Sequence, residues 1–197
     1  MIKSPGDTER SYRHIILRND LECVLVSDPT TDKSSAAMQV SVGHMSDPKD
    51  LPGLAHFCEH MLFQGTKTYP GPASYKKFLS DHGGSSNAST GMVYTTYFFD
   101  VTHPHLEPAL SRFSKFFIEP LFDVNSVDRE LNAVNSENGK NVLNDRRRLF
   151  QLSKHLSDPQ HSYSKFGTGN RSTLETIPKE NGINVRNELL KFHQQYY

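Results

Sequence analysis

Residues 51–66, LPGLAHFCEHMLFQGT, constrain the fold more than any other part of the sequence. Pro52 suits the first turn of a helix and Gly65 suits its end, so we expect a helix over 52–64. Apolar side chains lie on nearly all sides of this helix, which predicts that other elements bury it. Such burial is typical of a domain in which strands and helices pack in layers.

The remaining chain predicts a mixture of strands and helices. Strands are expected over 21–27 and 36–42, which could pair as a hairpin, and within 85–102. Further helices are expected over 73–82, 104–117, 123–156 (with a disturbance at Gly139) and 185–197, with a loop over 157–181. No repeat, low-complexity tract or domain linker separates these elements. We therefore predict one α+β domain over 1–197.

Composition excludes several classes of function. The 197 residues include 22 basic and 22 acidic side chains, so no overall charge favours nucleic acid or an acidic membrane. The first 20 residues are polar and lack the apolar core of a signal peptide, and no stretch is apolar enough to cross a bilayer. Cys23 and Cys58 do not form a disulfide framework. We expect a cytoplasmic location, with the peroxisome and the mitochondrion as alternatives.

Two histidines and a glutamate share one face of the predicted helix. His56 and His60 are four residues apart, and with Glu59 they fall within an arc of roughly 100°. Two imidazoles at this spacing can hold one zinc ion while the carboxylate reaches a water on that ion, provided that a third protein ligand is present. The alternative is a set of hydrogen-bonded core histidines with a salt-bridged glutamate, since burial of three unpaired ionisable groups is costly.

The third ligand is expected from residues 123–156. Glu130 and Glu137 are seven residues apart and share a helix face, so either could bind the metal or support a ligand histidine. Spacing does not choose between them, and a solvated glutamate is the alternative for both. The basic run Arg146, Arg147 and Arg148 is interpreted as a solvated helix face, with a contact to an anionic partner as the alternative.

Three segments together carry a family resemblance. HFCEHMLFQGT, SSNAST and DRELNAVNSEN closely resemble the pitrilysin-type metallopeptidases, which have the inverted zinc motif HxxEH, and in particular their insulysin-like branch. The likeness extends over essentially all of the chain, including FFIEPLF and SKFGTGNRSTLET. It implies a mixed, largely antiparallel sheet with helices packed on one face. It also implies that 1–197 is most of the first of four related domains, and so an incomplete one.

The resemblance assigns roles to individual residues. The implied roles are zinc ligand for His56, His60 and Glu137, general base for Glu59, and a supporting place beside the site for Glu130. Asn87 and Ala88, within SSNAST, are implied to line an edge strand to which the substrate peptide adds as a further strand. Backbone pairing along such an edge recognises extended peptides with little demand on their side chains.

The expected function is a zinc-dependent endopeptidase that cleaves small to mid-sized peptides, such as insulin-like hormones, with a glutamate-activated water. One alternative is a truncated, non-catalytic fragment that binds zinc or a peptide and needs a partner half. Another is a metal-free relative of the same fold, against which the intact motif argues. The expected partners are peptide substrates and either a C-terminal half or a second copy of the chain, without nucleic acid or membrane.

Overall fold

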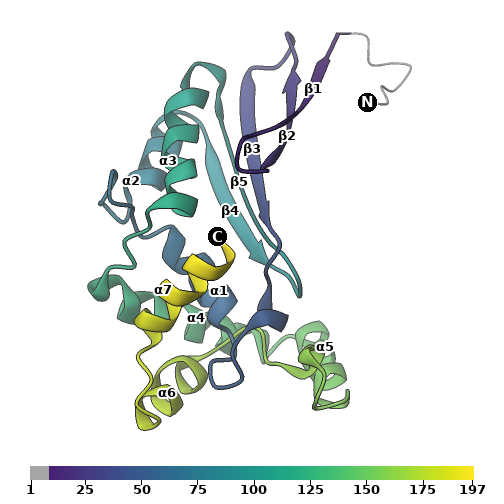
Figure 1. Cartoon of the computed structure of the whole chain (residues 1–197), viewed down its shortest axis with the longest axis vertical. Coiled ribbons are helices and arrows are strands. Elements are labelled where there is room, and N and C mark those ends of the chain that lie inside the picture. The colour runs from purple at the N-terminus through teal and green to yellow at the C-terminus, as the bar shows by residue number, and fades with distance from the viewer. Residues whose placement is uncertain (1–8) are drawn as a thin grey trace.

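Three antiparallel strands form the main sheet of the computed structural model, which describes residues 9–197 (Figure 1). Their order is β3 (Lys33–Val40), β5 (Thr95–Thr102) and β4 (Ser85–Thr90). The central strand β5 buries every second side chain, including Tyr97 and Phe99, because successive residues of a strand point to opposite faces. Residues 1–8 begin the polar stretch in which the sequence predicts no signal peptide, and they lie outside the described residues.

The strand over 21–27 pairs differently from the prediction. It is β2 (Glu22–Ser27), and its partner is β1 (Ser11–Ile16) in a separate two-stranded sheet, whereas β3 pairs with β5. A tight turn decides this pairing: the Leu17 N–H donates to the Leu21 carbonyl, and Asp20 adopts a left-handed φ of 64°. The sequence analysis predicts no strand over 11–16, although Tyr12, Ile15 and Ile16 favour one, so the hairpin of 21–27 with 36–42 is wrong.

The segment 85–102 contains two strands. The Gly91 N–H donates to the Tyr94 carbonyl across the turn that joins β4 to β5. The register pairs Ala88 with Tyr97 and Asn87 with Phe98. This hairpin makes β4 an edge strand of the main sheet, because among residues 9–197 it pairs with β5 alone.

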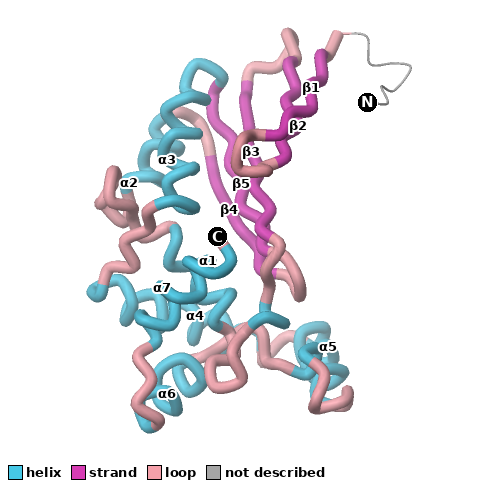
Figure 2. The backbone as a smooth tube through the Cα atoms, viewed as in Figure 1, coloured by secondary structure: helices cyan, strands magenta, loops and turns pink. Residues whose placement is uncertain are grey.

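Helices cover one face of the main sheet, as the α+β prediction requires (Figure 2). Helix α3 (Leu106–Ile118) packs on β3 and β5, and its Phe113 ring lies 5.1 Å from the Phe99 ring. Helix α2 (Ser74–Asp81) packs on β4 and α3. Because the described strand pairs are all antiparallel and the helices share one face, the predicted fold class is confirmed.

The long helix predicted over 123–156 is two helices. They are α4 (Val124–Asn141) and α5 (Asp145–His155), and Gly139 lies inside α4. The break comes at Asn144, whose backbone is extended and whose side chain accepts a hydrogen bond from the Arg147 N–H. An asparagine in this position begins a new helix, so the predicted disturbance at Gly139 is misplaced.

The rest of the chain adds short helical turns and one longer helix. The segment 157–181, predicted as a loop, contains a 3₁₀ turn (Ser162–Ser164), a π-helical turn (Ser172–Thr176) and α6 (Ile177–Glu180). Other 3₁₀ turns are His44–Ser46 and His103–His105. Helix α7 (Val185–Tyr196) buries Leu189 and Phe192 and packs on α1 (Leu54–Leu62). Within residues 9–197 no helix combines the length and apolarity needed to cross a membrane.

Candidate metal centre

Helix α1 forms the floor of the candidate site. Its apolar side chains are buried, and it lies among β4, α4 and α7. Both carboxylate oxygens of Asp47 fix its first turn, accepting hydrogen bonds from the Gly53 N–H at 2.7 Å and the Ala55 N–H at 2.8 Å. These donors are among the unpaired N–H groups at a helix start, so Asp47 does the work of a cap from outside the helix.

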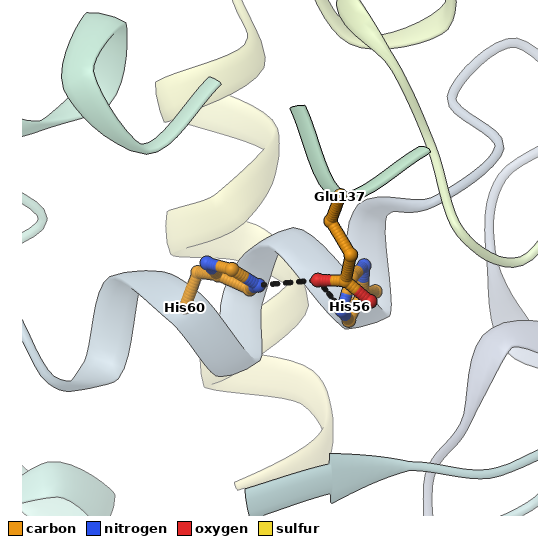
Figure 3. Close-up of side chains that lie close together, drawn as sticks. All are labelled: His56, His60 and Glu137. Atoms are coloured by element: carbon orange, nitrogen blue, oxygen red, sulfur yellow. Dashed lines mark ion pairs between the residues drawn. The ribbon is translucent and has the colours of Figure 1, made fainter. Parts of the chain in front are cut away.

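The structure brings His56, His60 and Glu137 together (Figure 3). Glu137 reaches down from α4, and its Oε2 lies 3.5 Å from His56 Nε2 and 3.6 Å from His60 Nε2. One ligand atom from each residue falls within 4.8 Å of the other two. Two imidazole nitrogens and one carboxylate oxygen are the donor types that zinc binds in catalytic sites.

The second ring nitrogen of each histidine already has a partner. His56 Nδ1 lies 2.7 Å from the Thr168 carbonyl oxygen, and His60 Nδ1 lies 3.2 Å from Glu130 Oε2. Each Nδ1–H can donate to its oxygen, which leaves the Nε2 lone pairs directed at the shared centre. Glu130 therefore lies beside the site rather than at the point where the three ligand atoms converge.

Two glycines allow Thr168 to reach α1. A Cβ atom on Gly53 would lie 2.3 Å from the Cα of Gly169, and both glycines have positive φ. Only residues without side chains permit this close crossing of two backbones. It brings the carbonyl of Thr168 against the N-terminal turn of α1.

Glu59 is buried between α1 and β4. Its Oε2 accepts a short hydrogen bond from Thr90 Oγ1. Burial raises the pKa of the Glu59 carboxyl above its ordinary value, although the Thr90 hydrogen bond and the nearby imidazoles act in the opposite direction. A buried carboxyl with a raised pKa holds a proton more readily than a solvated one, as a general base needs to do.

The electrostatics of this cluster suit a cation. Burial lowers the pKa of His60, but hydrogen bonds to Glu130 and Glu137 outweigh burial and raise that pKa to about 9. The pKa of Glu137 is lowered, first by its hydrogen bond with His60 and further by the positive charges of His56, His60 and Arg147. Three carboxylates therefore surround two imidazoles, and this arrangement stabilises positive charge.

A cleft of about 830 Å³ contains these groups and part of β4. Asn87 and Ala88 line it, next to Glu59 and the two histidines. The Asn87 side-chain oxygen accepts a hydrogen bond from the Ala88 N–H at 2.9 Å. The predicted ligands, the predicted base, Glu130 and the predicted substrate-strand residues therefore all lie around one cleft.

The sequence profile of the insulinase family (peptidase family M16) matches residues 22–160. This chain belongs to the insulinase family. The insulin-degrading enzyme of Mus musculus is 59% identical over 197 residues, which are 100% of this chain and 19% of that protein. The A-factor-processing enzyme of Saccharomyces cerevisiae is 56% identical over 193 residues, 98% of this chain and 19% of the relative.

A solved insulinase-type structure shares the fold. The crystal structure of pitrilysin matches with a TM-score of 0.93 and 40% identity, over 100% of this chain and 20% of that chain. The predicted resemblance to pitrilysin-type and insulysin-like peptidases is therefore confirmed. The chain spans about a fifth of the length of the relatives it matches.

The sequence analysis does not predict two hydrogen-bond partners of the site residues, the Thr168 carbonyl and the Thr90 hydroxyl. A backbone carbonyl such as that of Thr168 is independent of residue type, so no pattern could identify it. Thr90 is the last residue of the SSNAST segment, but only the packing of β4 beside α1 shows that it meets Glu59. The roles of ligand, base and substrate strand stay predictions at this point.

Proposed function

We propose that this chain is the zinc-binding part of an endopeptidase that hydrolyses small to mid-sized peptides. The observation that carries the proposal is the convergence of two histidine nitrogens and one carboxylate oxygen on a single point, 3.5 to 3.6 Å apart across each histidine–glutamate pair. Family membership supports peptidase chemistry at this point. His56, His60 and Glu137 are the proposed ligands.

The donor set fits zinc. Both histidines present Nε2 with Nδ1 occupied, and the surrounding carboxylates favour a cation. A zinc ion held there would lower the pKa of the attacking water and polarise the scissile carbonyl. Glu130 keeps the His60 ring oriented, and Thr168 does the same for His56.

Glu59 is the proposed general base. It removes a proton from the attacking water and later returns it to the nitrogen of the leaving amine. Its burial and raised pKa suit both directions of transfer, and the Thr90 hydroxyl fixes the carboxylate. The reaction hydrolyses one peptide bond. Glu59 holds the proton that it takes from the water until it passes that proton to the leaving amine.

β4 is the proposed substrate strand. Its free edge lies in the same cleft as Glu59, so a peptide paired along Asn87 and Ala88 would pass the base. The Asn87 side chain, which accepts from the Ala88 N–H, would have to release that donor to the peptide. The proposed substrates are peptides of the size of insulin-like hormones, by analogy with the mouse relative.

The test measures zinc and cleavage in one experiment. The purified chain should bind one zinc ion, and cleavage of a peptide of about 30 residues should stop when a chelator removes the metal. Glu59→Gln should keep zinc and lose cleavage, whereas Glu107→Gln on the exposed side of α3 should change neither. Full activity of Glu59→Gln would refute the base, and absence of bound zinc would refute the site.

A second candidate function is a zinc- or peptide-binding fragment that needs a partner half. The observation in its favour is the chain's length, about a fifth of its relatives. Zinc binding without cleavage, together with cleavage restored by a separately supplied remainder, would favour this candidate.

A further inference from the structure

The cleft that contains the candidate metal centre is lined by acidic side chains at the centre and by several basic ones. The acidic side chains that line it are Glu59, Glu130 and Glu137, all within the cluster around the two histidines. The lysines and arginines that line it are Lys76, Arg147, Arg148 and Lys154. Outside this cluster, the lining therefore contains cations and no acidic residue.

Most of these cations already have a partner. Arg148 Nη1 lies 3.0 Å from Asp145 Oδ1, and Lys154 is buried with its Nζ 2.9 Å from His44 Nε2. Lys76 Nζ lies over the ring of Phe63 at 5.1 Å. Each of these interactions limits what the cation can offer to a ligand.

Arg147 is different. It is exposed at the start of α5, and among residues 9–197 its guanidinium forms no ion pair. Its backbone N–H is fixed by Asn144, so the first turn of α5 holds the residue at the cleft. Its positive charge reaches Glu137, where it contributes to the lowered pKa after the histidines.

We propose that Arg147 binds an acidic side chain of the substrate close to the scissile bond, so that the chain selects peptides with Glu or Asp there. This inference rests on the proposed function. A peptide paired along β4 would lie in the same cleft as Arg147, and an extended peptide directs every second side chain to the same side. The planar guanidinium can hold a carboxylate through two parallel hydrogen bonds.

A neutral substrate is disfavoured by the same geometry. An apolar side chain that covers Arg147 takes water from the guanidinium and returns no hydrogen bond, and the amide oxygen of Gln returns a weaker one than a carboxylate. The competing choice is an apolar side chain packed on Phe150, Val142 or Leu152, which also line the cleft and are 39%, 56% and 50% exposed.

The test compares matched peptides on a chain that cannot turn them over. The zinc-loaded chain carries Glu59→Gln, and binding of a fluorescein-labelled 15-residue peptide of Ala, Ser and Gly is followed by anisotropy. Its central residue is Glu, Gln, Leu or Lys. We expect the Glu peptide to bind about three- to tenfold more tightly than the Gln and Leu peptides, and the ratio to shrink at high salt.

Variants of α5 assign this preference to one residue. Arg147→Gln should remove the preference, and Arg147→Glu should transfer it to the Lys peptide. Arg146→Gln makes the same charge change on the same helix outside the cleft lining, and it should keep the preference.

The outcomes separate this inference from the proposed function. Bound zinc and equal binding of all four peptides would overturn the inference alone, as would a preference that survives Arg147→Gln. Tightest binding of the Leu peptide would overturn it in favour of the Phe150 contact. Absence of zinc would refute the metal site itself, and zinc without any peptide binding would overturn both the inference and the proposed substrate strand.

Discussion

At the scale of single residues, the candidate site depends on side chains that do not touch the point of convergence. Glu130 accepts from His60 Nδ1, and Thr168 accepts from His56 Nδ1. These contacts fix the rings before any metal binds, so less conformational freedom is lost on binding. Such outer partners commonly contribute 10- to 100-fold to metal affinity.

Replacement of Glu130 should therefore weaken zinc binding without removing a ligand. Glu130→Ala should raise the dissociation constant for zinc about 10- to 100-fold, because the His60 ring loses its orienting acceptor and the centre loses a nearby negative charge. Competition with a chromophoric chelator measures the change. Asp128→Asn removes an exposed carboxylate from the same helix and should leave the affinity unchanged. Equal affinities for Glu130→Ala and the unaltered chain would contradict the role of Glu130.

His44 predicts a pH dependence of stability. Burial, then the charge of Lys154, lowers the pKa of His44 to about 4 in the folded chain, against 6.5 for an unperturbed histidine. Between these values the unfolded chain binds the extra proton, so the free energy of unfolding decreases as the pH falls from 6.5 towards 4. This single group should account for about 2 kcal/mol between pH 7 and pH 5.

Urea titrations of metal-free protein at several pH values test this prediction. The unaltered chain should lose about 2 kcal/mol more than His44→Gln between pH 7 and pH 5, since the variant cannot titrate there. His103→Gln, at an exposed histidine, should follow the unaltered chain. Parallel pH profiles for the unaltered chain and His44→Gln would disprove the assignment.

At the scale of elements, α1 is held by a residue from the preceding turn. Asp47→Ala should lower the free energy of unfolding by about 2 kcal/mol, because two N–H groups of the buried first turn lose their acceptor. Asp50→Ala, in the same turn but exposed, should change stability little. Chemical denaturation measures both. A smaller loss for Asp47→Ala than for Asp50→Ala would be incompatible with the anchoring of α1.

Local signals account for the elements that the sequence predicted well. Helix α1 lies between a proline and a glycine and has a continuous apolar surface, and α3 repeats its apolar residues at helical spacing. The sequence predicts α4 and α5 as one helix because only one capping contact, the hydrogen bond that the Arg147 N–H donates to the Asn144 side chain, separates two helical patterns. The sequence analysis predicts the wrong partner for β2 because it predicts no strand before the Leu17–Leu21 turn, although Asn19 and Asp20 favour a turn there.

In the candidate site too, the sequence predicts the features that are local and misses those that depend on how elements pack. The spacing of His56, Glu59 and His60 on one turn of helix is local, so the sequence could predict their common face. The choice between Glu130 and Glu137 depends on how α4 crosses α1, which spacing along one helix does not contain. The place of Arg147 beside Glu137 needed both that crossing and the break before α5.

At the scale of the whole molecule, the walls of the cleft come from α1, α2, α4, α5 and β4, with the 3₁₀ turn at His44 and the loop 166–168. The chain spans about a fifth of its relatives, so a longer protein has further surface with which to enclose a peptide. Zinc affinity should depend on the residues within this chain. Substrate positioning should depend strongly on surfaces that the chain does not contain, because orientation of bound reactants contributes a large part of catalysis.

If zinc binding depends on this chain and substrate positioning on surfaces outside it, a complementation experiment should change the cleavage rate and leave zinc binding unchanged. The chain alone should bind one zinc ion and cleave a peptide of about 30 residues slowly. Addition of the mouse insulin-degrading enzyme lacking its matching 19% should increase cleavage at least about tenfold, since a peptide held on two sides is better oriented. The same remainder added to the chain that carries Glu59→Gln should restore nothing, and the remainder alone should be inactive. Equal rates with and without the remainder would show that this chain holds all the surface that catalysis needs. Activity of the remainder by itself would remove Glu59 from the mechanism.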